Sequence, residues 1–221
     1  MSRISRNEGK VRDLASELET LEVRREMLVP LKTYIRYGAH IGTNKKTKDM
    51  ERFIFKRKGG VYLINILKTD ERIRLAARLL SQYQPNEVAV FGTRLYAQKP
   101  IIKMSKWTGF LAFPGRFLPG TLTNPELVSY VEPEIILISD PIKERQAILE
   151  ATMVGIPIAA LCDTNNTLSN IDLAIPANNK GRKSLALIFW LLTNQILRER
   201  KELPEEETIK ETPEDFMVML S

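Results

Sequence analysis

The chain contains a single cysteine and a single histidine, and this scarcity excludes several classes of protein. Cys162 has no second cysteine for an internal disulfide, which argues against a small secreted scaffold. His40 stands far from Cys162 in the sequence, so the spacings that hold zinc are absent, and a catalytic Cys–His pair would need the fold to bring the two together. We therefore expect no metal, no cofactor and a reducing cytoplasmic location.

Long apolar runs are also missing. The longest, from Leu185 to Leu192, has eight residues, whereas a helix that spans a bilayer needs roughly 20. The first residues lack the charged, apolar and small-residue pattern of a signal peptide. With 43% hydrophobic and 27% charged residues, the composition is that of an ordinary globular protein that buries its own core. We expect no membrane segment.

Positive charge is concentrated in the middle of the chain. Residues 29–198 hold 24 basic and 13 acidic side chains, while residues 1–28 hold six of each and residues 199–221 hold three basic and eight acidic. Within the middle, residues 32–58 carry nine basic side chains against two acidic, and residues 94–116 carry five against none. This distribution favours a polyanionic partner, with nucleic acid as the leading candidate.

The middle of the chain alternates between short apolar segments and helical patterns. A helix is expected from the Thr69-Asp70-Glu71 cap to about residue 82, another over 93–105 with a kink or break at Pro100, a third from Asp140-Pro141, and a last one over about 181–199. Strands are expected near residues 88–92, 110–113, 135–138, 156–161 and 173–175. This alternation predicts an α/β fold, doubly wound, with a mostly parallel sheet and helices on both faces.

Three regions follow from these patterns: an N-terminal helical extension (1–30), an α/β body (31–203) and an acidic C-terminal tail (204–221). The extension could be a short helix that lies on the body or on a partner, or a partly ordered helix in solvent. The apolar end of the tail, residues 216–220, is expected to be exposed and so to attract a protein partner.

An enzyme on this sheet remains an alternative, because doubly wound sheets often bind nucleotides at the carboxyl ends of their strands. The segment 178–184 resembles the end of a phosphate-binding P-loop, but that motif requires Lys and Gly where this chain has Arg182 and Pro176. Asp163, with the three polar residues that follow it, is the other candidate, although a turn that bonds its own backbone explains it as well. The alternative is thus a nucleotide-binding enzyme that uses Asp163 and the 178–184 loop.

The basic segments make stronger candidates for function. Lysines in a loop opened by Gly42, and the basic tip of a hairpin expected over residues 53–64, could reach phosphates without disturbing the core. Aromatic residues nearby could stack on unpaired bases, or simply belong to the core; they are Tyr34, Tyr37, Phe53, Phe55 and Trp107. The candidate RNA-binding residues are Lys45, Lys46, Lys48, Arg52, Lys56, Arg57, Lys58, Arg94, Lys99, Lys103, Arg116, Lys180, Arg182 and Lys183.

Three segments resemble one family: residues 34–42 (YIRYGAHIG), 113–125 (FPGRFLPGTLTNP) and 133–192, which opens PEIILISDPIKERQ. The family is the S-two family of small-subunit ribosomal proteins, in its archaeal and eukaryotic form, and the resemblance covers about residues 31–203. No counterpart of the coiled-coil insertion of bacterial members is found here.

The resemblance implies a flavodoxin-like sheet, no catalysis, and a cytoplasmic, ribosome-bound protein with no membrane or small-molecule partner. It implies that ribosomal RNA and neighbouring ribosomal proteins are bound where the head and body of the small subunit meet. The loop after Gly42 matches a family segment expected to lie on RNA. The 56–58 hairpin tip, Arg94, the Arg116 loop and residues 180–183 correspond to further expected contacts.

Overall fold

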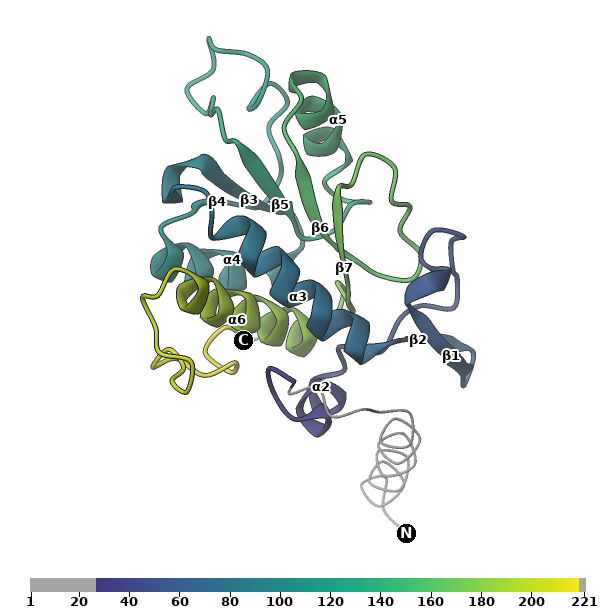
Figure 1. Cartoon of the computed structure of the whole chain (residues 1–221). Coiled ribbons are helices and arrows are strands. Elements are labelled where there is room, and N and C mark those ends of the chain that lie inside the picture. The colour runs from purple at the N-terminus through teal and green to yellow at the C-terminus, as the bar shows by residue number, and fades with distance from the viewer. Residues whose placement is uncertain (1–26, 219–221) are drawn as a thin grey trace.

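A single parallel sheet organises the protein, whose computed structural model describes residues 27–218 (Figure 1). Its strands are β3 (Val88–Gly92), β4 (Leu111–Pro114), β5 (Ile135–Ile138), β6 (Ile158–Cys162) and β7 (Leu173–Pro176). They lie in the order β4-β3-β5-β6-β7, with every neighbouring pair parallel. This is the flavodoxin-like order of a doubly wound sheet, so the predicted fold class is confirmed.

Helices cover both faces of the sheet, because both faces of its strands are apolar. The helices are α2 (Leu31–Tyr37), α3 (Ile66–Leu80), α4 (Leu95–Thr108), α5 (Arg145–Val154) and α6 (Arg182–Glu199), with short 3₁₀ turns η1 (Glu51–Phe53) and η2 (Pro85–Glu87). Val88 and Val90 of β3 face the core shared with α3, α4 and α6. Ala89 and Phe91 face the opposite core, which includes Ala147 of α5. Figure 1 shows α5 apart from α3, α4 and α6.

Helix α6 is enclosed along its first half, as its uninterrupted apolar sequence predicts. Every residue from Leu185 to Leu192 is buried, and the helix packs against both α3 and α4 (Figure 1). Despite this apolar character, none of the helices within residues 27–218 is long and apolar enough to cross a membrane.

Two helix starts differ from the sequence-based expectations, and of the kink or break predicted at Pro100 the break does not occur. Helix α3 begins before Thr69, because the side chain of Asn65 accepts a hydrogen bond from Leu67 N at 3.0 Å and caps the helix there. Helix α5 begins at Arg145, because Asp140 instead caps a separate turn by accepting a hydrogen bond from Ile142 N at 3.1 Å. Helix α4 continues through Pro100 to Thr108.

The described part of the tail folds back on the body instead of extending from it. Trp190 Nε1 in α6 donates a hydrogen bond to the carbonyl oxygen of Glu211 at 2.8 Å. Phe216 is 0% exposed and belongs to the core beneath α6. The expectation of an exposed apolar tip was therefore wrong for Phe216, because α4 and α6 leave an apolar surface that the tail covers. Residues 219–221 and the N-terminal residues 1–26 lie outside the described residues.

Candidate nucleic-acid interface

A short hairpin carries the densest group of cations. Strands β1 (Ile54–Lys58) and β2 (Val61–Ile64) pair antiparallel, with Lys58 opposite Val61. The connecting Gly59 and Gly60 have φ angles of 60° and 84°, a left-handed conformation that glycine adopts readily and that tight two-residue turns require. The turn thus holds the basic side chains of β1 at the end of the hairpin, as the sequence predicts.

The lysine-rich loop that precedes the hairpin is fixed to the carboxyl edge of the sheet. Thr164, just after β6, accepts a hydrogen bond from Thr43 N through Oγ1 at 2.9 Å and donates one from Oγ1 to the carbonyl of Lys45 at 2.9 Å. Thr47 N donates to the carbonyl of Thr164 at 3.0 Å. The loop backbone is therefore held by the sheet, while the Lys45, Lys46 and Lys48 side chains are exposed.

Gly42 is required for this attachment because the backbone comes very close to its neighbours. A Cβ atom at this position would lie 2.4 Å from Thr164 Cγ2 and 2.8 Å from the carbonyl oxygen of Tyr62. Any side chain here would push the lysine loop away from both β2 and the sheet.

The loop and the hairpin form one surface. Gly42 N donates to the carbonyl of Tyr62 at 2.9 Å, and Tyr62 N donates to the carbonyl of Thr43 at 2.8 Å. The Tyr62 ring lies beneath two cations, 5.8 Å from Lys46 Nζ and 5.3 Å from Arg57 Cζ. We call this the hairpin–loop surface; its basic residues are Lys45, Lys46, Lys48, Arg52, Lys56, Arg57 and Lys58.

Two acidic residues lie among these cations and are already engaged. The Glu51 carboxylate forms an exposed ion pair with Lys46, and Asp49 accepts a hydrogen bond from Leu168 N at 3.0 Å. The hydrogen bond that the Lys46 ammonium donates to Glu51 raises the pKa of Lys46, so the ammonium stays charged at neutral pH. The hairpin–loop surface is thus strongly cationic and held on a firm backbone.

Arg94 and Lys180, two other predicted RNA contacts, lie in a polar network at the carboxyl edge of the sheet. Arg94 Nε donates to Asp140 Oδ2 at 2.7 Å, and Lys180 Nζ donates to Asp163 Oδ2 at 2.5 Å. Both carboxylates are about 1% exposed. Asn166 joins the two pairs, since its amide donates to Asp140 Oδ1 at 3.3 Å and its Oδ1 accepts from Asp163 N at 2.6 Å. These two cations have a structural partner within the chain.

Three further predicted contacts hold the tail. Lys99 Nζ donates to the carbonyl of Met217 at 2.7 Å, and Lys103 Nζ pairs with Glu211 Oε1 at 2.6 Å. Arg182 Nη1 donates to the carbonyl of Val218 at 3.3 Å. The remaining two candidates are exposed: Arg116 lies in the loop after β4, and Lys183 lies in the first turn of α6.

The crevice where this fold usually binds ligands is filled by the protein's own carboxylate. The strand order reverses between β3 and β5, and doubly wound sheets bind ligands at the carboxyl ends of such strands. Here Glu144 accepts hydrogen bonds from the backbone amides of Thr93 and Asp140, the second at 2.9 Å. Burial raises the pKa of Glu144 to about 7, and the nearby Asp140 charge acts in the same direction. A nucleotide phosphate would have to displace this side chain from the amides.

The other features of an enzyme site are not assembled in residues 27–218. That part of the chain has no group of three His, Cys, Asp or Glu residues able to hold a metal. The Cys162 thiol donates to the carbonyl of Ala160 at 3.6 Å, and burial raises its pKa above the usual thiol range. Burial also lowers the pKa of His40. Asp163 and the 178–184 loop do meet, but through the internal Lys180 pair.

The aromatic candidates divide between core and surface. Tyr34 and Phe53 are buried, and the Tyr34 hydroxyl donates to Asp70 at 2.8 Å, so neither can stack on a base. Tyr37 is also buried, whereas Phe55 and Trp107 are partly exposed. The ring beneath the two cations is Tyr62, which the sequence identified only as a strand residue. A two-residue turn at Gly59-Gly60 places Arg57 opposite Tyr62 in the hairpin. The sequence could therefore have predicted this contact from the Gly59-Gly60 pair.

Comparison with known proteins gives a consistent match. The family model described as ribosomal protein S2 matches residues 34–131 and 129–198. The small ribosomal subunit protein uS2 of Staphylothermus marinus is 52% identical over 194 residues, which cover 87% of this chain and 88% of the relative. That of Ignicoccus hospitalis is 49% identical over 187 residues, covering 84% and 88%. That of Saccharolobus solfataricus is 48% identical over 196 residues, covering 88% and 85%.

Proposed function

The chain belongs to the ribosomal protein S2 family, and we infer that it serves as a non-catalytic component of the small ribosomal subunit that binds ribosomal RNA. The observation that carries the RNA-binding part is the hairpin–loop surface. Five of its seven cations are exposed, and Lys56 and Lys58 are partly exposed, on a loop and a hairpin that are bonded to each other and to the sheet. Each phosphate that they neutralise releases condensed counterions, which favours binding at low salt.

The structure suggests an order of importance among the proposed RNA contacts. The hairpin–loop residues, Arg116 and Lys183 would bind phosphates directly. Lys46 would exchange its exposed ion pair with Glu51 for a phosphate. Five others are bonded to the polar network at the sheet edge or to the tail, and they would have to share or exchange these partners on RNA; they are Arg94, Lys99, Lys103, Lys180 and Arg182. We propose that these five residues mainly stabilise the fold and contact RNA only secondarily.

We further propose that neighbouring ribosomal proteins bind this chain where the head and body of the subunit meet. Glu205, Glu206 and Glu207 form an exposed acidic run after α6, and such a run suits the basic proteins of a ribosome. The cytoplasm is the proposed location, as it is where ribosomes assemble and work.

A salt titration tests the RNA contacts. Replacing Lys45, Lys46 and Lys48 with Ala should weaken binding to small-subunit ribosomal RNA and reduce the slope of log K against log salt by about 2–3, since each lost phosphate contact contributes ~0.7–0.9. The matched control replaces Lys32, Lys68 and Lys143, exposed lysines outside the hairpin–loop surface, and changes the net charge equally.

An unchanged slope in the first variant, or an equal loss in the control, would remove the lysine loop from the interface. Membership of the particle is tested separately by sedimenting the tagged chain from lysate on a sucrose gradient. We expect co-migration with small subunits that RNase treatment abolishes. Migration as a free protein would contradict the proposed function itself.

A further inference from the structure

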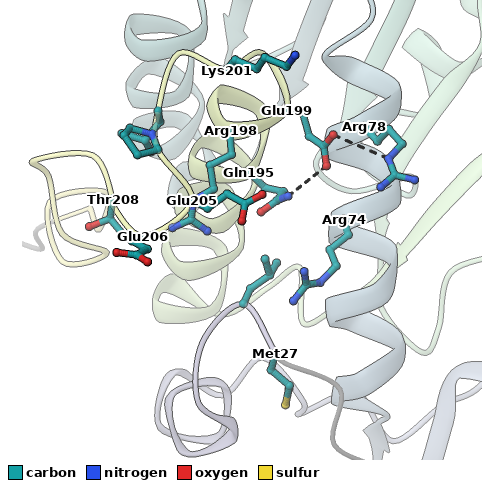
Figure 2. Close-up of a pocket in the computed structure, with 13 residues that line it drawn as sticks. Met27, Arg74, Arg78, Gln195, Arg198, Glu199, Lys201, Glu205, Glu206 and Thr208 are labelled. Carbon is teal, nitrogen blue, oxygen red and sulfur yellow. Dashed lines mark hydrogen bonds and ion pairs between the residues drawn. The ribbon is translucent and has the colours of Figure 1, made fainter.

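Two hollows of the described surface differ in how far their cations are engaged within the chain. The first lies between α3, α6 and the segment that follows α6, and it has a volume of about 980 Å³ (Figure 2). Figure 2 shows Arg78 joined to Glu199, and Arg198 donates to the carbonyl of Glu207 at 2.7 Å. Arg74 is paired within α3. The arginines of this hollow are therefore bonded inside the chain, and a ligand would have to displace their partners.

The second hollow lies within the hairpin–loop surface and has a volume of about 610 Å³. We call it the loop hollow; its lining is Lys48, Asp49, Arg52, Leu168 and Ser169. The first three residues come from the lysine loop and the η1 turn, and the last two come from the loop between β6 and β7. Ligand pockets in proteins commonly measure about 300–1,000 Å³, so the loop hollow has room for one nucleotide of an RNA chain.

The two loops that form the walls are bonded to each other. Asp49 Oδ2 accepts a hydrogen bond from Leu168 N at 3.0 Å, and Thr47 Oγ1 donates to the carbonyl of Asn166 at 2.6 Å. Met50, which follows Asp49 in the chain, is buried in the core on the α5 side of the sheet. The walls are therefore in place before a ligand arrives, which reduces the entropy that binding costs.

The two cations of the loop hollow are available to a ligand. Lys48 and Arg52 are exposed, and neither has an ion-pair partner in the part of the chain that the structure describes. Arg52 Cζ lies 4.9 Å from the centre of the Phe53 ring. Contact with a ring positions a guanidinium and leaves the N–H groups in its plane free for a phosphate. Glu51, a nearby carboxylate, pairs with Lys46 instead.

The carboxylate of the lining is compatible with a phosphate beside the cations. Asp49 is bonded through Oδ2 to Leu168 N, and its single charge is exceeded by those of Lys48 and Arg52. Asp49 is exposed, so its second oxygen is an acceptor at the edge of the hollow. A ribose 2′-OH is a donor that such an oxygen binds, and this group distinguishes RNA from DNA.

The apolar part of the lining favours a nucleotide that is unpaired. Leu168 packs on the core with one side and lines the hollow with the other. A base can lie on an apolar side chain only when its face is free, whereas in a duplex the neighbouring bases cover that face. The exposed Ser169 hydroxyl beside it can bond to the edge of such a base.

We propose that the loop hollow receives one unpaired nucleotide of the small-subunit ribosomal RNA. The phosphate pairs with Lys48 and Arg52, and the 2′-OH donates to Asp49. The base packs on Leu168 beside Ser169. This inference rests on the proposed function, because the nucleotide belongs to an RNA that the hairpin–loop surface holds. A free nucleotide lacks the high effective concentration that this attachment provides, so the hollow is not expected to saturate with free nucleotides.

Photo-crosslinking in assembled subunits tests the proposal. A benzophenone amino acid replaces Thr167, an exposed residue next to Leu168, in the tagged full-length chain. Subunits are isolated and irradiated, and the crosslinked nucleotide is mapped by reverse transcription. We expect crosslinks to the RNA at one nucleotide or its direct neighbours. The 2′-OH of that nucleotide should react with an acylating reagent in the deproteinised RNA, as an unpaired position does, and should be protected in the subunit.

Two variants of the full-length chain show whether the loop hollow causes the protection. Lys48→Ala combined with Arg52→Ala removes the phosphate contacts, and Ser169→Trp fills the hollow without changing its charge. The first should raise acylation of the mapped nucleotide at least about tenfold, as the loss of charge-assisted hydrogen bonds does. The second should raise it as well, because the base no longer has room.

The matched controls change exposed residues outside the lining of the hollow: Lys32→Ala combined with Lys143→Ala, and Asn86→Trp. Both should leave the nucleotide protected. Crosslinks to a protein, crosslinks to paired RNA alone, no crosslinks in subunits that contain the chain, or protection that survives both hollow variants would each overturn the proposal. Failure of the chain to enter subunits is a different result, because it would contradict the proposed function instead.

Discussion

Replacing Gly42 with Ala should detach the lysine loop from the body without touching any cation. The added Cβ would lie 2.4 Å from Thr164 Cγ2 and 2.8 Å from the Tyr62 carbonyl oxygen. The second contact is with backbone, which cannot rotate away. The chain around residue 42 must therefore move, and it would stretch the bonds from Gly42 N to Tyr62 and from Thr43 N to Thr164, both 2.9 Å long.

The size of the effect follows from these contacts. Overpacking a tight site costs about 1–3 kcal/mol, and each strained hydrogen bond adds up to about 1 kcal/mol. We expect Gly42→Ala to lower the free energy of unfolding by about 2–4 kcal/mol. RNA affinity should fall together with stability, because Lys45, Lys46 and Lys48 would leave their positions.

A second substitution tests whether the clash is the cause. Thr164→Ser removes Cγ2, the atom in closest contact, and keeps the hydroxyl that holds the loop. The double variant should recover about 1 kcal/mol relative to additivity, as expected for neighbours in contact. The assay is urea unfolding of all four proteins followed by tryptophan fluorescence. A Gly42→Ala protein within about 0.5 kcal/mol of the parent, the range of ordinary surface changes, would refute the reasoning.

Three further predictions concern the body. Burial raises the pKa of Glu144 from 4.5 to about 7, so this group stabilises the fold below pH 4.5 and loses that contribution as the pH rises through 7. Glu144→Gln should reduce the difference between the free energies of unfolding at pH 5 and pH 7.5, measured with urea. The control Glu132→Gln, at an exposed glutamate, should leave that difference unchanged. Phe216→Ala should lower the free energy of unfolding by about 3–5 kcal/mol, and a change below about 1 kcal/mol would contradict its place in the core. Nucleoside triphosphates should show no saturable binding by calorimetry; saturation that is lost in Asp163→Ala would restore the enzyme alternative.

The sheet was predictable because each of its elements is encoded locally. Each apolar strand, and the helix of residues 181–199, can be recognised from its own short stretch of sequence. Alternating strands and helices with short connections can assemble in only a few topologies. The start of α3 was misjudged because Asn65 and Thr69 are both good caps, and only the packing of the chain before the helix decides between them.

The site was less predictable because its organisation depends on residues distant in sequence. Positive charge identified the lysine loop and the hairpin, yet it could not separate exposed cations from those with internal partners. Arg94 is paired with Asp140 and Lys180 with Asp163, and the local sequence does not reveal that these residues lie close together. The burial of Phe216 likewise depends on a surface built by α4 and α6.

The packing of Phe216 beneath α6 affects how the protein is made. Helix α6 is synthesised before residue 216, so the apolar surface that Phe216 covers is exposed until the tail has been made. Intermediates of this kind are prone to aggregation. Ile209 and Phe216 belong to the buried core, so premature termination before residue 216 would release a body whose core is incomplete.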